Sequence, residues 1–321
     1  MQYDVIALGE LLVDFTPSGY SEQGNPLYEA NPGGAPCNVL AMLTKLGKKT
    51  GFIGKVGNDL HGRFLKQALQ DVGIDDAGLV IADEFDTTLA FVALMPDGER
   101  DFAFVRKAGA DIALTVDEIQ KTMIEHTRIF HFGSLSLTDE PVRCATKSAV
   151  QYAKEKGCLI TFDPNMRELL WASMDMAKEQ MLWGCKKCDV IKLAKEELFF
   201  LTEEIELEAA ISVFRSKFPQ VKLIFVTDGK NGSHAYWGLE HVSQPAFLSS
   251  NTVDTTGAGD SFFGCCLAFL LDNDIGTLTE SLLSDMLKMA NAAASLITTK
   301  KGALKVMPSE DDIAILLENA H

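Results

Sequence analysis

The sequence predicts an α/β fold in which helices cover both faces of a central, mainly parallel sheet, giving a three-layer sandwich. The main observation is that short apolar runs alternate with helical patterns along almost the whole chain. Strands that alternate with helices are usually joined by right-handed crossovers, which place the strands parallel in one sheet. A second observation is a hairpin pattern that interrupts this alternation and predicts a small additional β element.

The helical patterns carry the usual start and stop signals. A helix predicted over 38–46 has its apolar residues on one face, and a helix predicted over 64–72 ends at Gly73. Pro141 in a first turn and Gly157 after a last turn mark another helix. The chain contains no internal repeat and no low-complexity linker, so a single domain is expected. The predicted strands are 5–8, 52–56, 129–132, 159–162, 190–193 and 223–226.

Two stretches predict a small β-sheet beside the main one. Residues 88–105 carry a hairpin pattern around a turn at 96–99, and residues 11–32 are rich in Pro and Gly. Together they predict a lid on the single domain 1–321, formed by about residues 11–33 and 86–108. A lid is expected because elements over the strand ends of a parallel sheet can close a site against water. An edge hairpin that only covers the core is the alternative.

Composition excludes several classes of protein. The chain has 321 residues, of which 47% are hydrophobic, so it can bury a large core without disulfides or a structural metal. The net charge of −16 disfavours binding to nucleic acid or to an anionic membrane surface. The first residues lack the basic start and apolar stretch of a signal peptide, and no apolar run is long enough to span a membrane. A soluble, cytoplasmic protein is therefore expected.

The seven cysteines are scattered along the chain, and only Cys185 and Cys188 form a close pair. A zinc site needs a second pair of ligands at a suitable spacing, and none is evident. Lysines between the two cysteines could lower a thiol pKa, so a redox role stays open. Free thiols in a reducing compartment are the alternative.

The segment 254–260, with the sequence DTTGAGD, carries the chemistry. It precedes an apolar run over 261–270 that predicts a helix. Small residues before a helix let backbone N–H groups approach an anion, and the helix start adds partial positive charge. That arrangement suits the charge that develops on phosphate during transfer. Asp260 falls in the first helical turn, where its carboxylate can accept the proton of an attacking hydroxyl. A tight turn with an Asp cap is the alternative.

Two better-known phosphate-binding motifs are absent. There is no G-x-x-x-x-G-K-[ST], so the chain is not a P-loop protein. The first strand ends with GELL and not with G-x-G-x-x-G, which disfavours a dinucleotide-dependent oxidoreductase. A distant segment, 31–38 (NPGGAPCN), also places two glycines before a helix, and the segment 52–62 (FIGKVGNDLHG) follows it.

With these segments the sequence resembles the ribokinase-like carbohydrate kinases of the phosphofructokinase-B type. Residues 33–62 resemble the N-terminal signature of that family and residues 254–266 its C-terminal signature, and the resemblance extends over essentially the whole chain. It implies a sandwich with a small β lid, and it makes Asp260 the base that activates the acceptor hydroxyl. The implied anion hole consists of the backbone N–H groups of Gly257, Ala258 and Gly259. The implied contacts to sugar hydroxyls are Asp14, Gly33, Gly34 and Asn38.

Further segments resemble fructokinases in particular: 104–111 (FVRKAGAD), 130–137 (FHFGSLSL) and 162–171 (FDPNMRELLW). The resemblance makes Arg106 a substrate contact and puts Asn165 and Arg167 near the sugar and phosphate pocket. A solvated hairpin charge is the alternative for Arg106. Asn165 could also be a turn residue beside a proline.

On the nucleotide side, 192–197 (KLAKEE) resembles the Asn-x-x-Glu pattern of the family. Glu197 matches the Glu that helps to hold Mg²⁺ through water, whereas Ala194 replaces an Asn or Ser and cannot bond phosphate. A solvated helix charge is the alternative for Glu197, and a surface amide is the alternative for Asn291. Asp228, in a segment that resembles the nucleotide loop, replaces a common apolar residue. The implied contacts to ATP are Lys192, Glu197, Thr227, Gly229, Gly232 and Asn291.

The resemblance also implies a monovalent cation site, with K⁺ as the candidate ion. Asp254 and Thr256 occupy the matching positions, and carbonyls around 298–302 would complete the site. Lids in this family often pair across a homodimer, so a homodimer through the lid is expected.

The resulting hypothesis is the reaction ATP + D-fructose → ADP + fructose 6-phosphate. Mg²⁺ and the anion hole would neutralise the developing charge while Asp260 takes the proton from the sugar. A kinase for 2-keto-3-deoxygluconate or another keto-sugar is the alternative within the class. A catalytically silent sugar-binding regulator is the alternative from another class.

Overall fold

The computed structural model describes residues 2–94 and 100–319. Its central layer is a sheet whose strands are β1 (Tyr3–Leu8), β4 (Thr50–Gly57), β5 (Asp75–Ala82), β8 (Thr127–Gly133), β9 (Leu159–Asp163), β10 (Val190–Ala194), β11 (Leu223–Thr227), β12 (Ser233–Trp237) and β13 (Glu240–Gln244). Among the described residues these nine strands follow the order β13-β12-β11-β10-β9-β8-β1-β4-β5. Neighbours from β11 to β5 pair in parallel, and β12 and β13 add an antiparallel edge. The predicted parallel sheet is confirmed.

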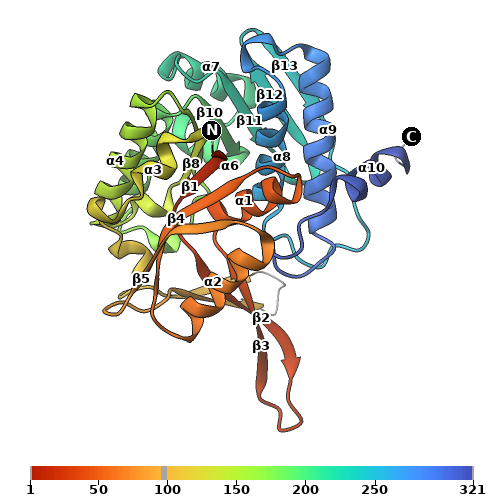
Figure 1. Ribbon diagram of the computed structural model, residues 1–321. Coiled ribbons are helices and arrows are strands. Elements are labelled where there is room, and N and C mark those ends of the chain that lie inside the picture. Colours follow the sequence, from red (N-terminus) through yellow and green to blue (C-terminus); the bar gives the residue numbers. More distant parts are fainter. Residues whose placement is uncertain (1, 95–99, 320–321) are drawn as a thin grey trace.

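Helices cover both faces of this sheet, as the ribbon shows (Figure 1). Alternate side chains of β1 reach opposite faces: Val5 and Ala7 belong to one buried cluster, Ile6 and Leu8 to the other. The helices of the first cluster are α1 (Ala35–Lys45), α2 (Leu60–Val72), α8 (Ala258–Asp272), α9 (Glu280–Ile297) and α10 (Glu310–Asn319). Those of the second are α3 (Lys121–Glu125), α4 (Val142–Glu155), α5 (Met174–Lys187), α6 (Lys195–Thr202) and α7 (Leu207–Lys217). Short 3₁₀ helices are η1 (Ala110–Ala113), η2 (Val116–Glu118), η3 (Leu135–Leu137), η4 (Glu168–Leu170), η5 (Gly229–Asn231) and η6 (Ile275–Thr277).

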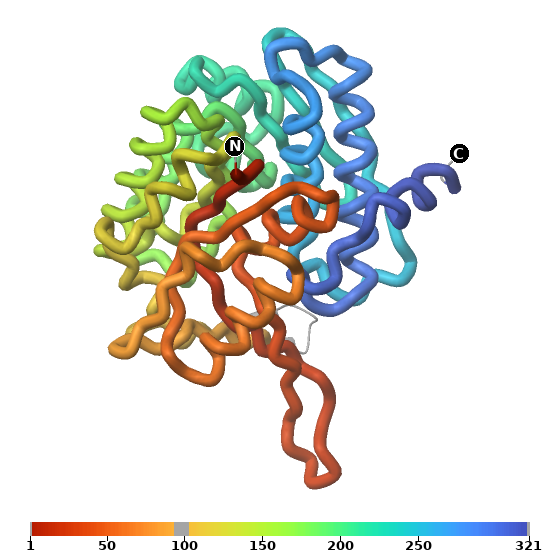
Figure 2. The backbone as a smooth tube through the Cα atoms, viewed as in Figure 1, coloured from red at the N-terminus to blue at the C-terminus, as the bar shows by residue number. Residues whose placement is uncertain are grey.

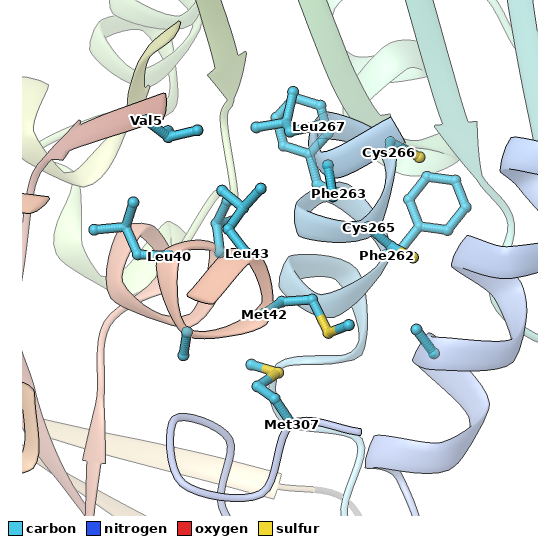
Figure 3. Packing of buried hydrophobic residues seen from close by; sticks show 14 of the residues in the cluster. Val5, Leu40, Met42, Leu43, Phe262, Phe263, Cys265, Cys266, Leu267 and Met307 are labelled. Carbon is cyan, nitrogen blue, oxygen red and sulfur yellow. The ribbon is translucent and has the colours of Figure 1, made fainter. Parts of the chain in front are cut away.

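The packing of α1 against α8 sets the geometry of the later site. Leu43 and Met42 of α1 lie in the buried cluster beside Phe263 of α8 (Figure 3). A Cβ atom at Gly264 would come within 2.7 Å of the Met42 Cβ atom, so this glycine allows the two helices to approach closely. Both helices start at the carboxyl-terminal side of the central strands. Their close contact therefore holds two distant parts of the chain, 34–38 and 257–260, in a fixed arrangement.

The lid is a separate sheet made of β2 (Leu12–Tyr20), β3 (Pro26–Gly33), β6 (Leu89–Leu94) and β7 (Arg100–Val105). Within the described part of the chain its order is β3-β2-β6-β7, with β2 and β6 parallel and both outer pairs antiparallel. The β2–β3 hairpin projects away from the body of the molecule (Figures 1 and 2). The predicted small sheet is confirmed, and the predicted turn at 96–99 lies outside the described residues.

Some boundaries and strands differ from the prediction. The helix expected from residue 38 begins at Ala35, because Gly34 takes the cap position with φ 125° and Pro36 fits the first turn. The strand β5 was not predicted; it starts with two aspartates, and only Gly78 and Ala82 of its residues are buried. The β12–β13 hairpin was also missed. None of the described helices is both long and apolar enough to cross a membrane.

Candidate active site

A cavity lies where the lid meets the carboxyl-terminal ends of the central strands, and we call it the first cavity. It is lined by residues of the lid, of the α1 start, of β10 and of the segment 254–260. Parallel α/β sheets usually bind their ligands at this edge. The predicted site residues that line it are Asp14, Gly34, Asn38, Asn165, Arg167, Lys192, Asp254, Thr256, Gly257, Gly259 and Asp260.

Asp260 is held at the bottom of this cavity by two amides from distant segments. Its Oδ2 accepts a hydrogen bond of 2.8 Å from Asn38 Nδ2, and its Oδ1 accepts one of 2.9 Å from Asn165 Nδ2. The side chain is only 6% exposed. Burial raises the pKa of Asp260, while the bond from Asn38 and the charge of Lys192 oppose that rise. A carboxylate that is fixed in this way and has a raised pKa suits a general base.

The turn before Asp260 leaves the start of α8 open to an anion. Gly257 is the cap residue, with φ 76°, and no side chain caps this helix. A Cβ atom at Gly257 would lie 2.6 Å from the Ala303 Cβ atom, so a larger residue would clash as well as strain the backbone. Uncapped backbone N–H groups at the start of a long helix form a favourable anion site.

Lys192 adds a positive charge beside this turn. Its Nζ lies 3.1 Å from Asp163 Oδ2 and 3.0 Å from the place that a Cβ of Gly259 would occupy. Burial alone would lower the pKa of Lys192, but Asp163 and other nearby carboxylates outweigh burial and raise it. The ammonium group therefore stays protonated next to the predicted anion hole.

Asp14 and Gly34 line the lid side of the cavity, and Gly33 lies directly behind Asp14. Gly33 faces Asp14 so closely that a Cβ atom there would collide with Asp14 Oδ2, and a Cβ at Gly34 would collide with the carbonyl oxygen of Glu10. Burial raises the pKa of Asp14 to about 7, and the charge of Arg167 opposes this rise. Glycine at position 33 is thus a steric requirement for placing the Asp14 carboxyl group, and glycine at position 34 allows the start of α1 to approach the Glu10 backbone.

A second cavity lies on the other side of the 255–259 turn. Residues of the loop after β11, of the segment 246–249 and of helices α8 and α9 line it. Asn291 is fixed at its wall, because its Oδ1 accepts from Ser233 Oγ at 2.9 Å and its Nδ2 donates to the Pro245 carbonyl oxygen at 3.0 Å. Thr255 and Gly259 line both cavities. The two cavities therefore meet at the predicted anion site, at the start of α8. The predicted ATP contacts that line the second cavity are Thr227, Gly229, Gly232 and Asn291.

A model of the pfkB family of carbohydrate kinases matches residues 2–310. The chain belongs to this family. It is 40% identical over 320 residues to fructokinase-1 of Zea mays, covering 98% of both chains. The structure of fructokinase with bound ATP from Xylella fastidiosa matches with a TM-score of 0.90 at 28% identity, covering 100% of this chain and 99% of that one. Fructokinase from Vibrio cholerae O395, in a form with bound fructose, ADP and calcium ion, gives 0.86 at 31% identity, covering 99% and 100%.

The family resemblance inferred from the two signatures is therefore confirmed, and so is the ribokinase-like fold. The chain is a carbohydrate kinase with a central mainly parallel sheet and a separate lid sheet. The residue roles taken from the signatures remain predictions. The geometry of this pfkB-family kinase shows which of these residues lie close together.

Arg106 and Gly33 are predicted substrate contacts that do not line the first cavity in the described part of the chain. For Arg106 the reason is its set of partners. Its guanidinium group is 7% exposed, and its Nε donates to Asp111 Oδ2 at 2.8 Å. Other nitrogens of the same group donate to Thr138 Oγ1 at 2.9 Å and to the Leu135 carbonyl oxygen at 3.1 Å. In this arrangement Arg106 ties the lid to the segment after β8, so it is not a solvated hairpin charge either.

Glu197 is buried and bonded to two backbone segments. Its Oε2 accepts from the Ala194 N–H at 2.7 Å and its Oε1 from the Met166 N–H at 2.8 Å. Glu197 lines neither cavity among the described residues. Each carboxylate oxygen has a further lone pair, which a metal-bound water would use in the predicted role. Mg²⁺ keeps several waters and takes its other ligands from phosphates, which fits a site with one protein carboxylate at a distance.

Asp228, which departs from the family pattern, has a structural partner. Its Oδ2 lies 2.9 Å from Lys195 Nζ and accepts a hydrogen bond of 3.1 Å from Asn231 Nδ2. These contacts join the loop after β11 to the start of α6. The structure thus explains a residue that the sequence pattern left without an interpretation.

The predicted cation segments lie side by side. Asp254 Oδ1 accepts from Thr256 N at 3.0 Å, and Asp254 Oδ2 accepts from Gly302 N at 3.1 Å. The backbone N–H of Asp254 also donates to the Thr298 carbonyl oxygen at 3.1 Å. The structure therefore brings together the two segments that the K⁺ hypothesis requires, and ion binding itself stays a prediction.

The cysteine pair lies away from both cavities. Cys185 and Cys188 are free thiols, both fully buried, and burial raises the pKa of each. A raised pKa keeps a thiol protonated and slow to react. In the described ranges, no group of three or more His, Cys, Asp or Glu side chains is arranged to hold a metal ion.

Proposed function

We propose that this kinase transfers the γ-phosphoryl group of ATP to the 6-hydroxyl of D-fructose. The observation that carries the proposal is that two separate cavities share the wall formed by Thr255 and Gly259, directly before Asp260. A phosphoryl group can pass from a donor in one cavity to an acceptor in the other only where the two meet. The fructokinases among the relatives support fructose as the acceptor.

ATP would lie in the second cavity, with its phosphates directed at the start of α8. The backbone N–H groups of 257–259 and the ammonium group of Lys192 would stabilise the charge on the transferring group, because fixed dipoles and charges need no rearrangement at the moment of reaction. Mg²⁺ bound to the phosphates would neutralise further charge, held through water by Glu197.

Fructose would lie in the first cavity, with the acceptor hydroxyl toward Asp260. The amides of Asn38 and Asn165 hold the two carboxyl oxygens of Asp260, so one remaining lone pair can accept the hydroxyl proton. Asn38 Oδ1 is buried and has no hydrogen-bond partner within the described residues, so it is placed to accept from another sugar hydroxyl.

The experiment is a comparison of sugars in an assay that measures ADP release. D-Fructose should give the highest kcat/KM. A higher kcat/KM with 2-keto-3-deoxygluconate or another keto-sugar would change the proposed acceptor but not the proposed kinase activity. Sugar binding without turnover of any sugar would favour a silent regulator and contradict the proposal.

The lid is also proposed to pair with the lid of a second copy. Tyr20, Leu27 and Tyr28 are exposed on the projecting β2–β3 hairpin, at 76%, 46% and 45% of their full area. Apolar side chains on an exposed hairpin favour a partner surface. Sedimentation analysis at micromolar concentration should give a homodimer, and a monomer would contradict this part of the proposal.

A further inference from the structure

Glu10 is a buried carboxylate that neither the motifs nor the proposed mechanism uses. It follows β1, and its side chain is 3% exposed. Its Oε1 accepts a hydrogen bond of 2.9 Å from the backbone N–H of Ala35, the first residue of α1. The cap residue of α1 is Gly34, which offers no side chain. Glu10 therefore caps this helix from a distant part of the chain.

The other oxygen of this carboxyl group has no hydrogen-bond partner in the described part of the chain. Glu10 Oε2 is buried and has no hydrogen-bond partner among the described residues. Glu10 also lines the first cavity, as does Asn38, whose Oδ1 is the other buried acceptor without a partner there. Proteins rarely leave buried acceptors unsatisfied, so each such atom needs an explanation. Two of them in the wall of one cavity indicate a ligand that carries several O–H donors.

The surrounding charges do not satisfy this oxygen. Burial raises the pKa of Glu10 to about 7, while the backbone N–H groups of Glu10 itself and of Ala35, and then the charge of Arg106, oppose the rise and Asp111 adds to it. The guanidinium group of Arg106 donates its hydrogen bonds to Asp111, Thr138 and Leu135 instead. A neutral hydroxyl is the suitable partner here, because a second anion would be repelled.

We propose that Glu10 is a sugar-binding residue whose free carboxyl oxygen accepts a hydrogen bond from a substrate hydroxyl. That hydroxyl is not the one that receives the phosphoryl group, since Asp260 accepts its proton. The inference rests on the proposed function in so far as the ligand is a sugar. A carboxyl group keeps an acceptor oxygen in either protonation state, so Glu10 can contribute to both affinity and orientation.

Glu10→Gln separates the observed helix cap from the proposed contact. The amide oxygen of Gln can still accept from the Ala35 N–H, whereas its NH₂ group replaces the free acceptor with a donor. The KM for fructose should rise about 10- to 100-fold, because a site built to bond a hydroxyl discriminates strongly once that bond is lost. The KM for ATP and the Tm should stay close to those of the parent. A fructose KM within twofold of the parent would show that Glu10 is only a cap.

Glu118→Gln is the matched control. Glu118 also accepts from a backbone N–H, that of Thr115, and it lies 2.7 Å from Lys55 Nζ. It lines neither of the two cavities as far as the described residues show. The same chemical change there should lower the Tm through the lost ion pair and leave the KM for fructose unchanged. An equal rise in KM for both variants would contradict a specific role of Glu10.

Monodeoxy analogues of fructose identify the hydroxyl. For the parent, the analogue that lacks the contacted hydroxyl should have a reduced kcat/KM, and for Glu10→Gln the same analogue and fructose should be used equally well. A uniform effect of Glu10→Gln on every analogue would contradict the proposed contact.

If the parent prefers another sugar, the comparison is made with that sugar, and the Glu10 inference can hold even though fructose is not the substrate. If the parent phosphorylates no sugar, the proposed function fails, and calorimetric sugar affinities of parent and Glu10→Gln decide the contact.

Discussion

The two cavities that meet at the 255–259 turn use different chemistry. The charged residues lining the first cavity are Glu10, Asp14, Asp254, Asp260, Arg167 and Lys192. The second cavity is lined mainly by glycine, threonine, serine and apolar side chains, and among its described residues Lys230 is the charged one. Under the proposed function, fixed side chains would contact the sugar hydroxyls in the first cavity, and backbone and apolar surface would contact the nucleotide in the second. Single substitutions should therefore cost more activity in the first cavity than in the second.

The largest effect is expected for Asp260→Asn. An amide cannot accept the hydroxyl proton, so kcat should fall at least about 100-fold, within the usual range for a general base. Asn38 and Asn165 both donate to this position, which leaves one donor without an acceptor in the variant. ATP binding should be measured alongside turnover to show that the variant is folded. A near-normal kcat would show that Asp260 is not the general base.

Lys192→Met removes the charge at the junction of the cavities and should lower kcat about 10- to 100-fold, because a fixed charge beside the transferring group is lost. It also leaves Asp163 buried without its partner, which typically costs about 3–5 kcal/mol of stability. The double variant Asp163→Asn/Lys192→Met should recover most of the stability, measured by urea unfolding, but not the activity. Recovery of both in the double variant would reduce Lys192 to a structural role.

The pH dependence of the stability of the unliganded protein tests the buried carboxyl groups of the first cavity. Asp14 has a folded-state pKa of about 7, above its ordinary value of 3.8, because of burial. Its protonated form therefore stabilises the folded state fully below about pH 4, and that contribution is lost as the pH rises through about 7. Asp14→Asn does not titrate. The Tm of the parent should thus fall relative to that of Asp14→Asn between pH 5 and pH 8. Parallel Tm curves for the two proteins would contradict the raised pKa.

The smallest effect is expected for Ala194→Asn, which restores the family residue on the nucleotide side. Ala194 is the cap residue of α6, so Asn there should raise the Tm by the equivalent of about 1 kcal/mol. A regained hydrogen bond to phosphate should lower the KM for Mg-ATP about fivefold, as one net hydrogen bond allows. A raised Tm with an unchanged KM would mean that the amide acts only as a helix cap.

The sequence was sufficient for the parts of the molecule that depend on local signals. The alternation of apolar runs and helices predicted the parallel sheet, and the glycine turn 257–259 before an apolar run predicted the start of α8, which has no side-chain cap. Local signals do not reveal pairs that form only in the folded chain. Lys192 and Asp163 are 29 positions apart, and their ion pair exists because β9 and β10 are neighbours in the sheet. The sequence did not indicate a binding role for Glu10, since a single acidic residue after a strand is usually exposed.

The predicted role of Arg106 is a second case in which the sequence did not reveal the partner of a side chain. The resemblance placed it at the substrate, whereas the structure pairs it with Asp111, only five positions away. A pattern of residues carries no information on which partner an arginine selects. A sugar-bound structure in which Arg106 has left Asp111 would support the substrate role, and one that keeps this pair would support a structural role.

The most direct test of the central account is phosphorus NMR of the products formed from ATP and D-fructose. The meeting of the two cavities in front of Asp260 predicts ADP and one sugar phosphate in equal amounts, with the phosphorus coupled to the two protons of carbon 6. Release of inorganic phosphate without a sugar ester, or no consumption of ATP in the presence of fructose, would contradict it.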